Sequence, residues 1–362
     1  MTMTDTLNEP GLELLDLAPN TLENVNDVFA RNQWTDGLPI VPPTAERVSA
    51  MLAASPVPGG AAMGDFPPRW RPTSVEQVAV NAVMAGCLPE HFPLVLAGIR
   101  AILDPTFNLY GLQATTNPAG VMLVVNGPVT KELGINSGFN LFGQGNRANA
   151  TIGRAIRLCM INIGGGLPGV GDMTPLGNPN KYGSCIAENT EASPWGTYAD
   201  EHGHPASAST VTAIAAMAPQ NVIILSAGAT DILEGIALAF HTSGSNCMHF
   251  TSEVAVVLGP VHANHIAEAG YDKAAVRRFL WEHSKITIGH LPKTDLYAVR
   301  GWKKKCVHVE DGREVMYVTE RPEDIGIFVA GGTVGPHSAI IPTFNNTHLV
   351  TRVVGDFGDD DH

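Results

Sequence analysis

The sequence predicts an α/β fold in which a largely parallel or mixed sheet is covered by helices. Continuous apolar runs at 120–128 and 253–259 have the length and composition of strands buried on both faces. Helical spacing of apolar residues follows these runs, at 148–163 and at 273–284. Because 44% of the 362 residues are hydrophobic, the chain has enough apolar material to bury such a sheet.

Residues 1–104 are predicted to form a helical N-terminal arm and cap region. We expect residues 1–20 to be a flexible arm. The proline-rich segment 35–44 (TDGLPIVPPT) should form neither a helix nor a central strand, because proline has no amide donor. Thr21 and Thr44 each precede helical spacing and are predicted N-caps. The predicted helices lie at 21–32, after Thr44, at 73–87 and at 90–103.

Residues 105–362 are predicted to form the α/β catalytic body, in which strands alternate with helices. The predicted strands lie at 110–116, 120–128, 209–218, 221–227, 253–259 and 324–331. The predicted helices lie at 148–163, 231–242, 261–270 and 273–284. A hairpin at 305–318 should turn at Asp311-Gly312. The recurrence of Gly-Pro after two strands, at Gly127-Pro128 and Gly259-Pro260, leaves a duplicated α/β unit open as an alternative.

Composition limits the partners of this chain. A net charge of −13 argues against nucleic acid, and no window reaches the ~18 apolar residues of a membrane span. Five cysteines without a CxxC pair, and an N-terminus unlike a secretory signal, predict reduced thiols and a cytoplasmic location. Charged residues make up only 16%, below the usual ~25%, so we expect part of the surface to be covered in an oligomer.

The first candidate site is the glycine-rich turn after the predicted strand 324–331. Ligands of open α/β sheets bind at the carboxyl ends of strands, where glycines let backbone amides approach a ligand. Gly331, Gly332, Thr333 and Ser338 are therefore predicted substrate-binding residues, and His337 a catalytic one. A tight structural turn is the alternative. The turn matches neither a P-loop nor a dinucleotide fingerprint.

The second candidate precedes the helix predicted at 148–163. Asn146, Arg147 and Asn149 cluster at its N-terminus, which attracts anions. Arg147 could clamp a carboxylate through two parallel hydrogen bonds. We therefore predict that these three residues bind the substrate.

The third candidate is the long segment 164–205, because an extended loop inside a compact domain is usually functional. Cys185 is its best candidate for a nucleophile or a soft metal ligand, although free cysteine is more commonly a small buried hydrophobe. Glu188 could transfer protons if it is partly buried, or could instead cap the loop. Both are predicted catalytic residues.

A metal site is the fourth candidate, and a divalent metal is the only cofactor that the sequence raises. Imidazole and thiolate are ligands of zinc and iron. The available ligands are His202, His204, His241, Cys247, His249 and His262. Their spacing fits no established ligand signature, so the metal site is an alternative to the first three candidates.

Several motifs together resemble a bacterial family of companions of the UGSC (seleno)proteins. These motifs are TDGLPIVPPT, TIGRAIRLCMINIGGG, CIAENTEASPW, GPVHANHIAEAG with KAAVRRFL, and VAGGTVGPHSAIIP. The resemblance implies a two-component enzyme in which a smaller subunit supplies thiol or selenol chemistry. Tyr182-Gly183-Ser184-Cys185 is similar to the GSC element, with tyrosine where the redox cysteine or selenocysteine would stand. That departure implies that a partner supplies the missing group.

The leading hypothesis is an enzyme, or the larger subunit of a two-component enzyme, acting on a small polar or anionic molecule. The step would be that of a lyase, hydratase or hydrolase, with thiol-linked redox open through a partner. One alternative is a metal-dependent hydrolase or hydratase using the His/Cys cluster. Another is a non-catalytic scaffold subunit of an oligomer. Polar and reactive residues collect at predicted strand ends, which favours the enzyme.

Overall fold

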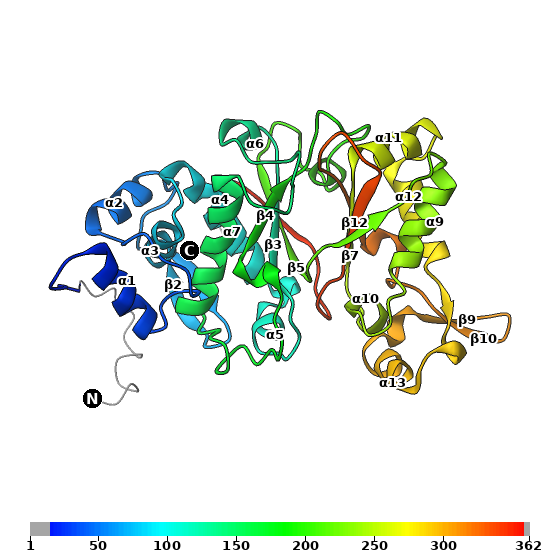
Figure 1. Ribbon diagram of the computed structural model, residues 1–362, viewed down its shortest axis with the longest axis horizontal. Coiled ribbons are helices and arrows are strands. Elements are labelled where there is room, and N and C mark those ends of the chain that lie inside the picture. Colours follow the sequence, from blue (N-terminus) through cyan, green and yellow to red (C-terminus); the bar gives the residue numbers. More distant parts are fainter. Residues whose placement is uncertain (1–14, 358–362) are drawn as a thin grey trace.

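The computed structural model describes residues 15–357, and within them two four-stranded sheets pack face to face between two layers of helices (Figure 1). The first sheet has the order β13-β5-β3-β4 and the second the order β11-β7-β12-β6. Their strands are β3 Gly120–Asn126, β4 Ser184–Ala187, β5 Thr210–Ala216, β6 Gln220–Ile223, β7 Val254–Leu258, β11 Ile325–Val329, β12 His337–Ile341 and β13 Val350–Val353. The predicted α/β fold is confirmed. The first 14 residues of the predicted arm lie outside the described residues.

Both sheets are mixed. In the described part of the chain, β3 pairs in parallel with β4 and β7 with β11, whereas the other pairings in these two sheets are antiparallel. All residues of β3, β5, β7 and β11 are buried, because helices cover one face of each sheet and the other sheet covers the opposite face. A strand buried in this way is apolar throughout, whether its neighbours are parallel or antiparallel.

The two halves repeat one topology, in agreement with the duplicated α/β unit. In each half a central strand, β3 or β7, pairs in parallel with the strand that follows the helices and antiparallel with the next one. The outermost strand comes from the other half: β6 follows β5 but pairs with β12, and β13 follows β12 but pairs with β5. The chain thus crosses between the sheets twice.

Helices form the outer layers. α3 Val75–Ala85, α4 Phe92–Leu103 and α7 Arg147–Asn162 cover the first sheet (Figure 1). α9 Ala229–Ala239, α11 Pro260–Glu268 and α12 Lys273–His283 cover the second. Because α3 and α4 share one hydrophobic core with β3 and β5, residues 75–103 pack as a layer of the first sheet.

The N-terminal helices begin where their caps predict. α1 Leu22–Arg31 follows Thr21, whose hydroxyl accepts a hydrogen bond from the amide of Asn24 at 3.3 Å. α2 Ala45–Ala53 follows Thr44 in the same way. The proline-rich segment between them contains neither helix nor strand, as predicted. Arg154 of α7 binds its Asp36 through two hydrogen bonds of 2.7 and 2.8 Å.

Some predictions of secondary structure were wrong. Residues predicted as a strand at 110–116 instead contain the short helix α5 Leu109–Gln113, because the Asn108 side chain caps its first turn. The long segment 164–205 is interrupted by β4 and by α8 Tyr198–Glu201. The hairpin is confirmed as β9 Val307–Glu310 and β10 Arg313–Met316. Elements that the sequence analysis did not predict are β1 Ala62–Phe66, β2 Arg71–Ser74, α6 Val129–Glu132, α10 Asn246–His249, β8 Ile286–Thr287, α13 Lys293–Trp302, β12 and β13.

Within residues 15–357, no single helix has both the length and the apolar character needed to cross a membrane. The segments Pro89–Leu103 and Pro105–Gln113 reach that length and apolar character only in combination, and they are bent by 70° to each other.

The packing of α7 on β4 gives a stability prediction. A Cβ on Gly153 of α7 would lie 2.5 Å from the backbone nitrogen of Ser184, so Gly153→Ala must displace the strand. We expect a loss of about 1–3 kcal/mol in the free energy of unfolding, measured with chemical denaturant. The control is Gly301→Ala in α13, where a Cβ meets nothing within 4 Å and better helix propensity should stabilise by ~1 kcal/mol. Equal effects of the two substitutions would contradict the close packing.

Candidate functional site

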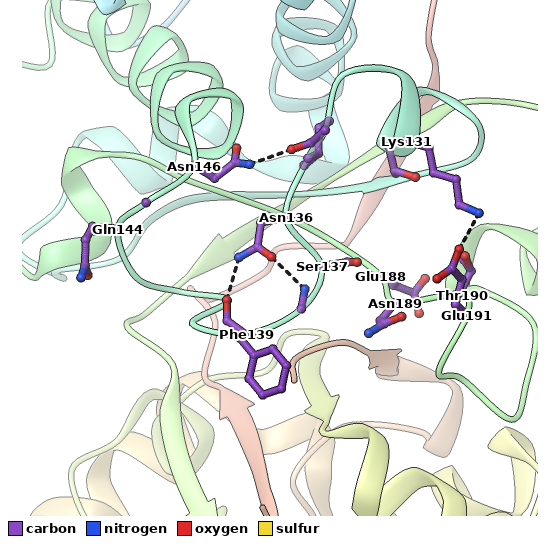
Figure 2. A pocket seen from close by; sticks show the side chains of 15 residues that line it. Lys131, Asn136, Ser137, Phe139, Gln144, Asn146, Glu188, Asn189, Thr190 and Glu191 are labelled. Carbon is purple, nitrogen blue, oxygen red and sulfur yellow. Dashed lines mark hydrogen bonds and ion pairs between the residues drawn. The ribbon is translucent and has the colours of Figure 1, made fainter. Parts of the chain in front are cut away.

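A cavity of about 570 Å³ opens at the carboxyl ends of the parallel strands β3 and β4 (Figure 2). The loop that follows β3 forms most of its wall, and the residues that follow β4 form the remainder. The lining residues are Thr130, Lys131, Gly134, Ile135, Asn136, Ser137, Gly138, Phe139, Gln144, Gly145, Asn146, Glu188, Asn189, Thr190 and Glu191. Carboxyl ends of parallel strands are where α/β proteins bind their ligands.

The second sheet meets the first beside this cavity. The amide of Asn189 donates to the carbonyl oxygen of Val329 at 2.8 Å, which joins the end of β4 to the end of β11. The amide of Gly331 donates to the carbonyl oxygen of Ser137 at 2.8 Å, so the glycine turn packs on the cavity loop. A Cβ on Gly332 would lie 2.3 Å from the Phe139 ring, which leaves room only for glycine there. The predicted turn therefore supports the cavity wall through its backbone.

Glu188 is the buried carboxyl group of the cavity, with a relative exposure of 4%. Its two oxygens accept hydrogen bonds from the backbone amides of Tyr198 at 2.8 Å and Val329 at 3.1 Å. Burial raises the pKa of this carboxyl, while the Lys273 ammonium and the two backbone amides lower it and offset part of the rise. A carboxyl in this position can exchange a proton with a bound molecule.

Two cations and a second carboxylate lie behind Glu188. The Lys273 Nζ atom lies 3.9 Å from an oxygen of Glu188 and 3.3 Å from one of Glu201. Arg277 binds both oxygens of Glu201, at 2.9 and 2.8 Å. The two positive and two negative charges balance, which offsets the cost of burying Glu188 and Lys273.

Lys131 and Glu191 pair across the cavity lining at 2.6 Å (Figure 2). Both side chains are 73% exposed, so water screens the attraction and the pair contributes little to stability. The cavity thus carries two carboxylates and one lysine among neutral amides and hydroxyls. This balance favours a neutral polar ligand over a strongly anionic one.

The two asparagines that were predicted to bind substrate, Asn146 and Asn149, hold the loop after β3 in place. Asn146 lines the cavity, caps α7 and donates to the carbonyl oxygen of Gly134 at 2.7 Å. Asn149 is buried, and its amide oxygen and nitrogen bind the backbone of Asn136 at 2.8 and 3.0 Å. The Asn149 nitrogen also donates to the carbonyl oxygen of Cys185 at 2.9 Å. Asn149 therefore holds the loop against β4.

The side chain of Arg147 makes a structural contact outside the cavity. Its guanidinium donates two hydrogen bonds, of 3.2 and 2.9 Å, to the carbonyl oxygen of Gly86 at the end of α3. It is not among the residues that line the cavity. A carboxylate clamp by Arg147 would have to break this contact.

Cys185 does not reach the cavity. Alternate residues of a strand face opposite sides, and Cys185 faces the helices of the first sheet whereas Ile186 faces the second sheet. Burial raises the pKa of its thiol to about 12. Because the thiolate is the nucleophile, this position disfavours the predicted nucleophilic or metal-binding role.

His337 and Ser338 lie in the second sheet, on the antiparallel strand β12. His337 is exposed, and its Nδ1 atom lies 3.0 Å from the side-chain oxygen of Asn221. Ser338 is buried against His262, with 2.8 Å between its hydroxyl and Nδ1 of the imidazole. Neither residue lines the cavity that contains Glu188.

Thr333 lines a second hollow of about 430 Å³, beside the end of β11 and the start of α11. Glu191 lines both hollows, which are therefore neighbours. The remaining lining residues of the second hollow are Ala192, Ser193, Pro260, Val261, Asn264, His265 and Glu268.

Residues 164–166, three glycines, begin the segment 164–205 that is the third candidate site. Gly164 and Gly166 pack against the side chain of Gln113, and Gly165 packs against that of Arg69. This loop precedes β4 and therefore lies at the end of the strand away from the cavity.

The six residues of the metal alternative do not come together. Among residues 15–357, no group of three or more His, Cys, Asp or Glu side chains could hold a metal ion. His249 pairs with Asp295 at 2.8 Å, and His241 contacts the carbonyl oxygen of Ser284 at 2.5 Å. Cys247 is buried in the core of the second sheet. His202 stacks on the ring of Tyr198, and the backbone amide of His204 donates to Ala199.

Sequence reasoning missed most of the cavity lining. The loop after β3 (127–146) is rich in Asn, Gly and Ser, and it follows one of the clearest buried strands. Ligands of α/β sheets bind at the carboxyl ends of strands, and this loop lies at such an end as residues 331–338 do. Lys273 was also missed, because a lysine at the start of a helix gives no sign of burial. No family model matches this chain, and no curated protein matches it significantly.

The role of Asn149 is testable. Asn149→Ala leaves the amide of Asn136 without a partner and removes one of two hydrogen bonds to its carbonyl oxygen, the other coming from the amide of Ala187. Residues 136–139 should therefore lose protection from hydrogen exchange by about tenfold or more. Arg147→Ala is the control, because it removes hydrogen bonds from the same helix that do not reach this loop. Unchanged exchange in Asn149→Ala would show that the loop is held by other contacts.

The burial of Cys185 predicts low reactivity. All five cysteines are free and buried, so we expect thiol reagents to label the folded protein slowly. Because burial raises the pKa of the Cys185 thiol to about 12, the reactive thiolate is scarce at pH 8. Mass spectrometry after timed alkylation checks this, with denatured protein as the control. Rapid selective labelling of Cys185 would restore it as a nucleophile.

Proposed function

We propose that this chain is an enzyme, or the larger subunit of a two-component enzyme, that acts on a small polar molecule bound in the cavity at the ends of β3 and β4. The observation that carries the proposal is Glu188, a buried carboxyl group that lines the cavity and whose pKa burial raises. Active sites place titratable groups in this situation so that they can exchange protons near neutral pH.

Glu188 is the proton-transferring group in this proposal. As a carboxylate it would remove a proton from the bound molecule or from water, and as an acid it would return that proton to a leaving group or product. Lyase, hydratase and hydrolase steps share this requirement. The side-chain amides of Asn136, Asn189 and Gln144 would orient the substrate through neutral hydrogen bonds.

A cytoplasmic location and a smaller thiol or selenol subunit remain part of the proposal. All five cysteines are free, which suits a reducing compartment. Because the thiol of Cys185 is buried, thiol-linked redox at the cavity would have to come from a partner. Phe139 and Val334 are 63% and 70% exposed, and Phe139 is part of the cavity lining, so this part of the surface offers apolar contacts to such a subunit.

The substitution Glu188→Gln tests the proposal. Candidate ligands are first found by thermal-shift screening of small polyols, amides and other neutral polar compounds, with hydroxy acids as the anionic comparison, since a ligand stabilises the folded state that binds it. Turnover of the ligands found is then followed by NMR, with and without the smaller subunit. We expect Glu188→Gln to lower the rate about 10²–10⁴-fold, because the amide cannot transfer the proton.

Glu191→Gln is the matched control for this experiment. It lines the same cavity but is exposed, so its loss should change the rate only a few-fold. Turnover that survives Glu188→Gln would remove Glu188 from the mechanism. Failure of every compound to stabilise the wild-type protein, with or without the smaller subunit, would favour the non-catalytic scaffold.

A further inference from the structure

A group of buried polar side chains lies behind Glu188, at the ends of β3 and β5. Asn126 is the last residue of β3 and lies opposite Thr210 across the β3–β5 ladder. The parallel register of Val125 with Ala187 places Asn126 beside Glu188 on β3 and β4. Asn126 and Thr210 are 2% and 0% exposed, and Lys273, at 3%, approaches Glu188 from α12.

These side chains have unused hydrogen-bonding capacity. In the described part of the chain, the amide atoms of Asn126 and the hydroxyl of Thr210 lack a hydrogen bond of good geometry. The ammonium of Lys273 lacks one as well, but it lies at ion-pair distance from Glu201 and Glu188. Leaving a buried polar group unpaired costs free energy, and an apolar residue of similar size would avoid that cost. Buried polar groups that lack hydrogen bonds are rare, so those beside Glu188 call for an explanation.

We propose that Lys273 and Asn126 are positioning residues that keep the Glu188 carboxyl in its ionised form at the cavity wall. The inference rests on the proposed function, because it concerns the group that transfers the proton. Lys273 lies 3.3 Å from Glu201 and 3.9 Å from Glu188. Because Arg277 already binds both oxygens of Glu201, the charge of Lys273 also balances that of Glu188. The Asn126 side chain, beside Glu188 in the parallel register, also lowers the pKa of this carboxyl.

The directions of the electrostatic effects agree with this geometry. Burial raises the pKa of Glu188, and Lys273 and Asn126 are among the groups that lower it. Without them the carboxyl would stay protonated to higher pH. The charged and titratable groups around Glu188 are Lys273, Arg277, Tyr198, Glu201 and Glu191.

The experiment follows the titration of Glu188 in the full chain by NMR of carboxyl-labelled glutamate, with Glu188→Gln identifying the resonance. We expect Lys273→Met to raise the midpoint by about one pH unit or more, because it removes a cation within 4 Å of the carboxylate. Lys273→Arg keeps the charge and should restore a midpoint near that of the wild type. The rising limb of any pH–rate profile should move to higher pH by the same amount in Lys273→Met.

Asn126→Leu tests the second positioning residue and also serves if Lys273→Met fails to fold. This substitution removes the amide that lies beside the Glu188 carboxyl and lowers its pKa, so it should also raise the midpoint. Thr210→Val is the matched control, because it removes a neighbouring unpartnered hydroxyl that does not act on Glu188.

A midpoint unchanged in both Lys273→Met and Asn126→Leu would overturn the inference, and so would a rise of the same size in Thr210→Val. The titration needs no ligand, so its outcome is separate from that of the Glu188→Gln rate measurement. Failure of the proposed function would appear as turnover that survives Glu188→Gln, whatever the midpoints.

Discussion

Two hydrogen bonds of Val329 join the ends of β4 and β11, and the architecture of the cavity depends on this junction. Val329 accepts a hydrogen bond from the amide of Asn189 and donates its own amide to the carboxylate of Glu188. Two sheets that pack only through apolar side chains could slide on one another, because apolar contacts have little directionality. The paired hydrogen bonds fix their relative position at the carboxyl ends of the strands.

This junction gives Glu188 two functions that compete. As a structural group it satisfies two backbone amides, which favours the carboxylate, and as a buried group it resists ionisation. Lys273 reaches the same carboxylate from the opposite half of the chain, so its charge depends on how the two halves meet. A substitution that weakens the junction should therefore alter both stability and proton transfer, and the two effects must be measured separately.

The duplicated topology explains why there are two neighbouring hollows and why they differ. Both lie at the carboxyl ends of parallel strand pairs, β3–β4 and β7–β11, and both include Glu191. The residue that follows β4 is Glu188, whereas its counterpart after β11 is Ala330, followed by glycines that pack on the first cavity. One half thus supplies a titratable group, and the other supplies the backbone against which the cavity loop packs.

The sequence by itself determined the α/β class, the caps of the first helices, the buried strands and the importance of strand ends, because these follow from local spacing and side-chain chemistry. It also singled out Glu188, as a residue of a long loop, and Asn146, as a residue at a helix N-terminus, and both line the cavity. Tertiary structure decided the rest. Strand direction could not be inferred, because strands buried between helices and a second sheet are apolar in either orientation. The packing of the second sheet on one face of the first turns Cys185 toward the helices. It also leaves Glu188, just after β4, at the cavity. The position of Lys273 was equally a matter of tertiary structure, because its charge is brought to Glu188 only when the two halves of the chain join.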